Sequence, residues 1–127
     1  MEIITHKKIS AQLCGKALET KESFSRVELK TDPSMTVDHH GLVHGGFIFG
    51  LADYAAMIAV NDPNVVLGSA DVKFLKPVRI GESVVAEASV TLKKGKKQMV
   101  SVIVTRNDEA VFTGEFACFV LEKHVLA

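Results

Sequence analysis

One acidic side chain stands alone in the most apolar stretch of this sequence. Asp53 is the only charged residue between His44 and Asn61, among Ala, Ile, Leu, Phe and Met side chains. Removing a carboxylate from water costs on the order of several kcal/mol unless a partner or a use for the charge compensates. Two glycines, Gly45 and Gly46, come just before it, and together these residues indicate a catalytic use.

The glycine pair is suited to binding a developing negative charge. The first N–H groups of a helix have no internal partner and lie at the positive end of the helix dipole. Glycine lets a ligand approach these amides closely, so Gly45 and Gly46 are candidate oxyanion-hole donors. Asp53 follows eight residues after Gly45, about 12 Å away at about 1.5 Å per residue. One chain therefore cannot bring both to the same carbonyl without a loop or a second subunit.

The elements that must position these residues follow from the spacing of apolar side chains. The stretch from Gly45 to Val60 is too long for one strand and rich in Ala, Leu and Met, so we predict a helix. It is apolar nearly all round, which predicts an enclosed helix. Alternating or continuous apolar runs predict strands elsewhere. These span Ile9 to Thr20, Phe24 to Thr31, Val65 to Lys76, Ser83 to Leu92, Met99 to Thr105 and Val111 to Leu121.

These elements predict one α+β domain over residues 1–127. Its antiparallel sheet of about six strands would curl around one long central helix, with the last four strands forming a meander. A single sheet cannot cover a helix on all sides. The exposed flank and edge therefore predict a homodimer, with a homotetramer as the other assembly considered.

Composition bounds the partners and the compartment. The chain has 15 basic and 15 acidic residues and a formal net charge of zero, so no attraction to nucleic acid or to a membrane surface is expected. Cys14 and Cys118 are interpreted as free thiols in strand-like settings, and the N-terminal residues lack the apolar core of a signal peptide. We therefore expect a cytoplasmic protein.

Three motifs carry a family resemblance. His44-Gly45-Gly46, Leu51-Ala52-Asp53 and Phe74-Leu75-Lys76-Pro77 resemble the motifs of hotdog-fold thioesterases of the PaaI-like (phenylacetyl-CoA thioesterase) group. The resemblance runs from about Gly41 to Ala117 and implies a hotdog fold and acyl-CoA thioesterase activity. It implies that a Gly45 or Gly46 amide polarises the thioester carbonyl, while Asp53 attacks it or activates water. It also implies sites between subunits and no cofactor, coenzyme A being part of the substrate.

Further polar residues near these motifs are candidates for the site. His44 opens the glycine motif and is a candidate catalytic residue, or a residue that fixes the loop. Asp38 stands where many relatives have Asn, and Asp71 where relatives often have a small hydroxyl residue. The candidate substrate-binding residues are Asp38, His39, Asp71, Lys73 and Lys76.

Basic residues in two other places have alternative roles. His40 and His44 have metal-ligand spacing only on a helix, which Gly41 and Gly45 disfavour, so no metal site is predicted. The hairpin turn at Lys93–Lys97 could contact coenzyme A phosphates, or it could be a solvated tip that discourages edge pairing.

Two other functions share the predicted fold. A hydratase or dehydratase would pair a loop histidine such as His39 with Asp53. A non-catalytic acyl-CoA sensor would need the fold but not the acid. The acyl group is not specified, because the residues that could line its pocket could equally be core: Phe47, Phe49, Tyr54 and Met57.

Overall fold

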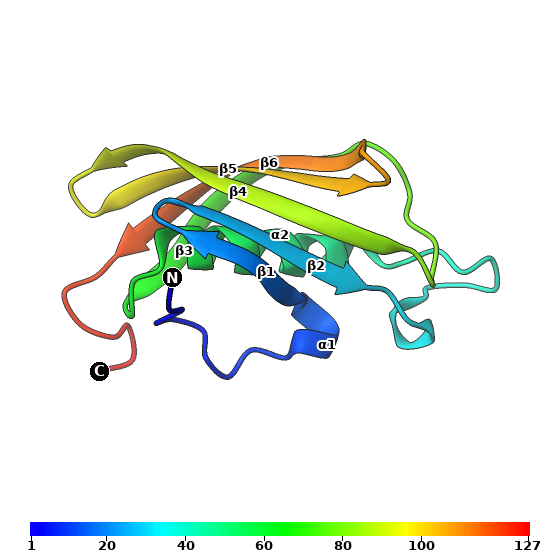
Figure 1. Cartoon of the computed structure of the whole chain (residues 1–127), viewed down its shortest axis with the longest axis horizontal. Coiled ribbons are helices and arrows are strands. Elements are labelled where there is room, and N and C mark those ends of the chain that lie inside the picture. Colours follow the sequence, from blue (N-terminus) through cyan, green and yellow to red (C-terminus); the bar gives the residue numbers. More distant parts are fainter.

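The computed structural model describes residues 1–127, in which a six-stranded sheet curls over one long helix (Figure 1). The N-terminal segment and a short helix lie on the side of α2 away from β4, β5 and β6. No helix is both long enough and apolar enough to cross a bilayer. In chain order the elements are α1 (Ala11–Cys14), β1 (Lys16–Lys21), β2 (Phe24–Lys30), η1 (Pro33–Met35), α2 (Gly45–Val60), β3 (Val65–Phe74), β4 (Ser83–Lys94), β5 (Lys97–Arg106) and β6 (Glu109–Val120).

The order of strands across the sheet is β1-β2-β4-β5-β6-β3, and every pairing is antiparallel. The predicted meander of the last four strands is correct for β4, β5 and β6 but wrong for β3. β3 pairs only with β6 and lies at the edge, while β4 pairs with β2 and β5, so the segment between β3 and β4 connects strands that are not neighbours. There Arg79 pairs with Leu42, and the N–H of Val43 donates to the carbonyl of Val78. Loop contacts of this kind leave no trace in strand periodicity.

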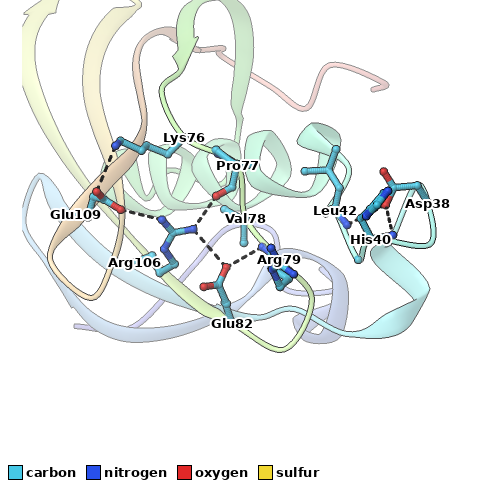
Figure 2. Close-up of a pocket in the computed structure, with 11 residues that line it drawn as sticks. Asp38, His40, Leu42, Lys76, Pro77, Val78, Arg79, Glu82, Arg106 and Glu109 are labelled. Atoms are coloured by element: carbon cyan, nitrogen blue, oxygen red, sulfur yellow. Dashed lines mark hydrogen bonds and ion pairs between the residues drawn. The ribbon is translucent and has the colours of Figure 1, made fainter.

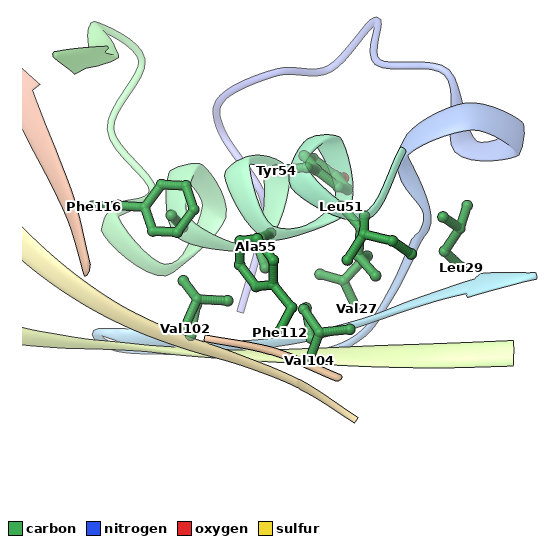
Figure 3. Close-up of a cluster of buried hydrophobic side chains, with 14 of the residues drawn as sticks. Val27, Leu29, Leu51, Tyr54, Ala55, Val102, Val104, Phe112 and Phe116 are labelled. Carbon is green, nitrogen blue, oxygen red and sulfur yellow. The ribbon is translucent and has the colours of Figure 1, made fainter. Parts of the chain in front are cut away.

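Helix α2 has the predicted bounds, Gly45–Val60, and most of its residues after Leu51 are buried, although its first half is not covered on every side. His44 caps its start, and Asn61 ends it in the left-handed conformation with φ of 53°. Nine of its residues are buried. Small alanines let its sheet-facing side lie close to the strands, and the buried hydroxyl of Ser25 donates to the carbonyl of Ala55 at 2.6 Å. Large side chains from β2, β5 and β6, among them Phe112 and Phe116, fill the remaining space (Figure 3).

The predicted strand from Ile9 to Thr20 is wrong in its first half. Residues Ala11–Cys14 form α1, and the strand begins only at Lys16. The Ser10 side chain caps α1 by accepting the N–H of Leu13 at 3.3 Å. Gly15 closes it with φ of +104°, and a Cβ there would lie 2.8 Å from Val27. Caps at both ends of α1 favour a helix here over the strand that the apolar pattern predicts. Cys14 therefore lies in a helix and not in a strand.

Candidate functional site

The start of α2 is held by the loop that precedes it. The N–H of His44 donates to the carbonyl of Met35 at 2.9 Å, and Thr36 forms a bridge with Val43. On the other side, the ring of Phe74 lies so close that a Cβ on Gly45 would be 3.1 Å from it. The helix start is thus fixed between this loop and the end of β3, and only a glycine fits there without displacing Phe74.

The two candidate oxyanion donors are not equivalent. The side chain of His44 accepts the N–H of Gly46 through Nδ1 at 2.7 Å, and a Cβ on Gly46 would lie 2.8 Å from that nitrogen. The N–H of Gly45 has no acceptor within the chain. Of the two predicted donors, Gly45 therefore offers the free amide, while His44 acts as the N-cap and occupies Gly46.

Asp53 lies in the middle of α2 without a partner. Its Oδ1 is buried and makes no hydrogen bond, and no cation pairs with the carboxylate. Burial raises its pKa to about 6. The thiols of Cys14 and Cys118 lie near enough for Asp53 to raise their pKa values too, although burial is the larger cause for both. Asp53 forms no ion pair with Lys73 or with a histidine.

A strip of α2 between the helix start and Asp53 is left uncovered by the chain. Gly46, Gly50 and Asp53 recur at intervals of four and three residues, so they share one face of the helix. A Cβ on Gly50 would meet nothing within 4 Å, and one on Gly46 would meet only the ring of His44. We call these three residues the glycine strip. Because α2 is continuous, the separation of about 12 Å between Gly45 and Asp53 holds in the folded chain.

An apolar pocket of about 270 Å³ opens beside Gly45. Its walls include Ile48 from α2 and Phe74 and Leu75 from the end of β3. Phe74 is 56% exposed and Leu75 48% exposed, although both are large apolar residues. A ligand or another chain that covered them would remove this surface from water.

A larger and more polar groove of about 670 Å³ lies next to this pocket (Figure 2). The guanidinium of Arg106 donates to the carbonyl of Pro77 at 2.6 Å and to Glu109 at 2.8 Å. Lys76 lies 3.5 Å from the other oxygen of Glu109. Arg79 lines the groove but its side chain belongs to no ion pair. Neither Arg79 nor Arg106 was predicted from the sequence, because neither belongs to a motif and only the fold brings them beside Lys76.

In the loop before α2, Asp38 and His40 line the groove, whereas Asp38 and His39 were the predicted substrate-binding residues. The Asp38 carboxylate accepts the N–H groups of His40 at 2.9 Å and Leu42 at 3.2 Å, so it holds the loop in shape while also lining the groove. His40 lines the groove as well, whereas the predicted His39 is not among its lining residues. His40 and His44 do not share a helix.

Asp71 and Lys73 do not join Asp53 within one chain. Val72 packs against Gly114 and the core, so its neighbours on β3 point to the opposite face of the sheet from α2. There they line a shallow hollow with Ser101, Thr113 and Glu115. Burial, and not a second acid, is the cause of the raised pKa of Asp53.

The lysine-rich hairpin tip is also remote from the helix start. Lys93 lies beside Val60 and Asn61, at the C-terminal end of α2. The tip of the β4–β5 hairpin therefore cannot reach a ligand bound at Gly45 of the same chain. The basic residues of the groove that adjoins the Gly45 pocket are instead Lys76, Arg79 and Arg106.

Comparison with curated proteins places this arrangement among known relatives. The family model described as the thioesterase superfamily matches residues 40–113, which include the helix start, Asp53 and most of the sheet. The chain is 52% identical over 116 residues to methylthioribose-1-phosphate isomerase of Aquifex aeolicus, covering 91% of this chain but 25% of that protein. It is 36% identical over 87 residues to transcription factor FapR of Shouchella clausii, covering 68% of this chain and 46% of that protein. The chain thus spans a quarter to a half of the length of these relatives.

Solved structures share the fold over a larger part of their length. An uncharacterised protein of Pyrococcus horikoshii, PH1136, is 55% identical with a TM-score of 0.99, covering 100% of this chain and 98% of that one. The phenylacetic acid degradation protein PaaI of Thermus thermophilus, in a mutant form, is 26% identical with a TM-score of 0.78, covering 86% of this chain and 95% of that one. The predicted resemblance to PaaI-like hotdog proteins is confirmed, and the chain belongs to the thioesterase superfamily.

Proposed function

We propose that this chain is an acyl-CoA thioesterase whose site is completed by a second copy. The observation that carries the proposal is the half-buried carboxylate of Asp53, whose Oδ1 is buried without a hydrogen bond and which shares a helix face with Gly46 and Gly50. Membership of the thioesterase superfamily supports it. The separation of about 12 Å along α2 supports a composite site, in which Gly45 of one copy and Asp53 of the other act on one thioester.

In the reaction we propose, Asp53 acts as a general base. It removes a proton from water as the water oxygen bonds to the thioester carbon, and the carbonyl oxygen becomes an oxyanion that accepts the free N–H of Gly45. The carbon–sulfur bond then breaks. The leaving thiolate takes the proton from Asp53, which regenerates the carboxylate. In the alternative route Asp53 itself attacks the carbon, and water hydrolyses the resulting mixed anhydride.

The surroundings of Gly45 support separate binding places for the two parts of the substrate, the acyl chain and coenzyme A. The apolar pocket with Phe74 and Leu75 would hold the acyl chain. The unpaired guanidinium of Arg79 in the adjoining groove would contact a phosphate of coenzyme A. The roles of Asp38 and Lys76 as substrate-binding residues remain proposals on the same basis, since both line that groove.

Thiol release from short, medium, long and aryl acyl-CoAs tests the proposal directly. We expect hydrolysis of at least one class, with a loss of at least about a hundredfold in Asp53→Asn. Asp108→Asn, in the exposed β5–β6 turn, is the matched control and should keep wild-type activity. Full activity in Asp53→Asn would overturn the assignment. Labelled oxygen from water found in Asp53 after one turnover would exclude the pure general-base route.

A second candidate is a regulatory ligand-binding domain, favoured by the similarity to transcription factor FapR. A binding domain would use the apolar pocket and the groove without turnover. Equal binding of acyl-CoAs by wild type and Asp53→Asn, with hydrolysis by neither, would identify this function instead.

A further inference from the structure

Arg106, the last residue of β5, ties two strands of the sheet to the segment between β3 and β4 (Figure 2). Its guanidinium donates to the carbonyl of Pro77 at 2.6 Å and to the carboxylate of Glu82 at 3.3 Å, both in that segment. It also donates to Glu109 of β6 at 2.8 Å. Only 18% of the Arg106 side chain is exposed. A guanidinium this well covered, with three acceptors, holds its partners more firmly than an exposed ion pair does.

The segment held by Arg106 separates the apolar pocket from the polar groove. Lys76, Pro77 and Val78 line both cavities, and we call these three residues the wall. Under the proposed function, a thioester with its acyl chain in the pocket and its coenzyme A part in the groove passes over the wall. The carbonyl of Pro77 accepts no backbone N–H. Arg106 is therefore the only hydrogen-bond donor of the chain that fixes this carbonyl.

The wall is also bonded to the loop before α2. The N–H of Val43 donates to the carbonyl of Val78 at 2.8 Å. Val43 is followed directly by His44, the N-cap of α2, and by Gly45, whose N–H is free. A displacement of the wall therefore reaches the Gly45 amide through two residues of backbone.

We propose that Arg106 is a positioning residue of the site. By holding Pro77 it fixes the wall, and through Val43 it fixes the direction of the Gly45 amide. The effect on the reaction rests on the proposed thioesterase function, whereas the holding of the wall does not. An oxyanion donor must stay within about 0.5 Å of its productive position. Loss of Arg106 therefore slows the chemical step and does not merely weaken binding.

Amide hydrogen exchange tests the holding of the wall without a substrate. The N–H groups of Val43 and Ile80 bond across the interface between the wall segment and the loop before α2, each at 2.8 Å. We expect Arg106→Gln to speed exchange at both by at least about tenfold. Amides in the middle of α2 report any global loss of stability in the same spectra. Unchanged protection of Val43 and Ile80 in Arg106→Gln would overturn the proposal.

Arg26 provides a matched control. It bonds two glutamates at 2.9 Å and 2.8 Å, as Arg106 bonds its own partners, but these glutamates belong to β1 and β4. Arg26→Gln removes a comparable network that does not include the wall. It should leave the exchange of Val43 and Ile80 and the kinetics of thiol release unchanged. An equal effect of Arg26→Gln and Arg106→Gln would show that the loss is not specific to the wall, and would overturn the proposal.

Kinetics with two thioesters of one acyl group separate positioning from direct contact. With the acyl-CoA we expect Arg106→Gln to lower kcat at least about tenfold. With the N-acetylcysteamine thioester, which has no phosphate, the loss of kcat should persist. Arg79→Gln, which removes a direct phosphate contact under the proposed function, should instead raise KM for the acyl-CoA. An effect of Arg106→Gln confined to that KM would identify a direct phosphate contact and refute the positioning role.

A conservative variant tests whether charge alone is enough. Arg106→Lys keeps the positive charge, but an ammonium lacks the planar fork that spans the three acceptors, so kcat and amide protection should stay low. Full recovery in Arg106→Lys would overturn the proposal. If wild type hydrolyses neither thioester, the proposed thioesterase function fails, and the exchange measurement decides by itself whether Arg106 holds the wall.

Discussion

The imidazole of His44 accepts the N–H of Gly46 at 2.7 Å, and this bond decides which helix-start amide is available to a ligand. The N–H of Gly45 has no acceptor in the chain. A histidine that opens a glycine motif invites a catalytic interpretation, but here the ring is directed back onto its own helix. A capping role predicts that another capping side chain can replace it.

His44→Ala should lower the free energy of unfolding by about 1 kcal/mol, the usual cost of losing an N-cap. His44→Asn should restore most of it, since asparagine caps well. Urea unfolding of both variants measures the difference, and thiol release measures activity beside it. If His44→Asn keeps its stability but loses as much activity as Asp53→Asn, the imidazole acts on the substrate and the capping interpretation is insufficient.

The raised pKa of Asp53 predicts the pH dependence of hydrolysis. A general base or nucleophile must be ionised, so kcat/KM should rise with pH and level off above the pKa of about 6. Below that value the rate should fall about tenfold per pH unit. The profile is measured with one acyl-CoA at concentrations well under KM. A rate that stays constant from about pH 4.5 to about pH 7.5 would contradict an essential Asp53 carboxylate.

The same shift predicts an unusual stability profile. The pKa of Asp53 is raised on folding, so between about pH 4 and about pH 6 the folded chain holds a proton that the unfolded chain releases. The contribution of Asp53 to stability is therefore fully present below this window and is lost as the pH rises through it. Asp53→Asn, which cannot ionise, should be more stable than wild type at about pH 7.5 by about 3 kcal/mol, since the pKa rises from 3.8 to about 6 and one pKa unit is about 1.4 kcal/mol.

Denaturant unfolding at about pH 4 and about pH 7.5 measures this difference. The advantage of Asp53→Asn should nearly vanish at the lower pH, where the wild-type carboxyl is protonated and nearly isosteric with the amide. The exposed Asp108→Asn should show no such trend. A variant less stable than wild type at the higher pH would reveal a favourable partner for the Asp53 carboxylate.

Sequence reasoning succeeded where a residue's role depends on its chain neighbours. The sixteen residues of α2 were predicted with both ends, because a long apolar run stops at the turn-forming segment from Asn61 to Asn64. It failed where the outcome depends on distant contacts. β3 lies beside β6, and Arg79 and Arg106 lie beside Lys76. Both placements depend on contacts between segments far apart in the chain, and the alternation of apolar residues along a strand does not predict such contacts. The helix α1 was wrongly predicted as part of a strand, although its capping residues, Ser10 and Gly15, are local features of the sequence.

The candidate site, too, has features that the sequence predicts and features that only the folded structure reveals. The pairing of a free helix-start amide with an isolated acid could be predicted, since both follow from helix geometry and burial. The division of roles between Gly45 and Gly46 could not, because it depends on the rotamer of His44. The sequence predicts that Asp71 and Lys73 share one face of a strand, but not which face of the sheet it is. The contact of Val72 with Gly114 on the inner face places both on the outer face.

Gly50 provides the sharpest test of the glycine strip. A Cβ there would meet nothing within 4 Å, so Gly50→Ala costs no packing and should favour the helix by up to about 1 kcal/mol. If a substrate or a second copy approaches this face, the added methyl must interfere. We therefore expect unchanged or increased helix content by circular dichroism, together with a loss of thiol release. A series from Gly50→Ala to Gly50→Leu should deepen the loss with side-chain size. Full activity in Gly50→Leu would show that nothing approaches the strip, and the path from Gly45 to Asp53 would have to lie elsewhere.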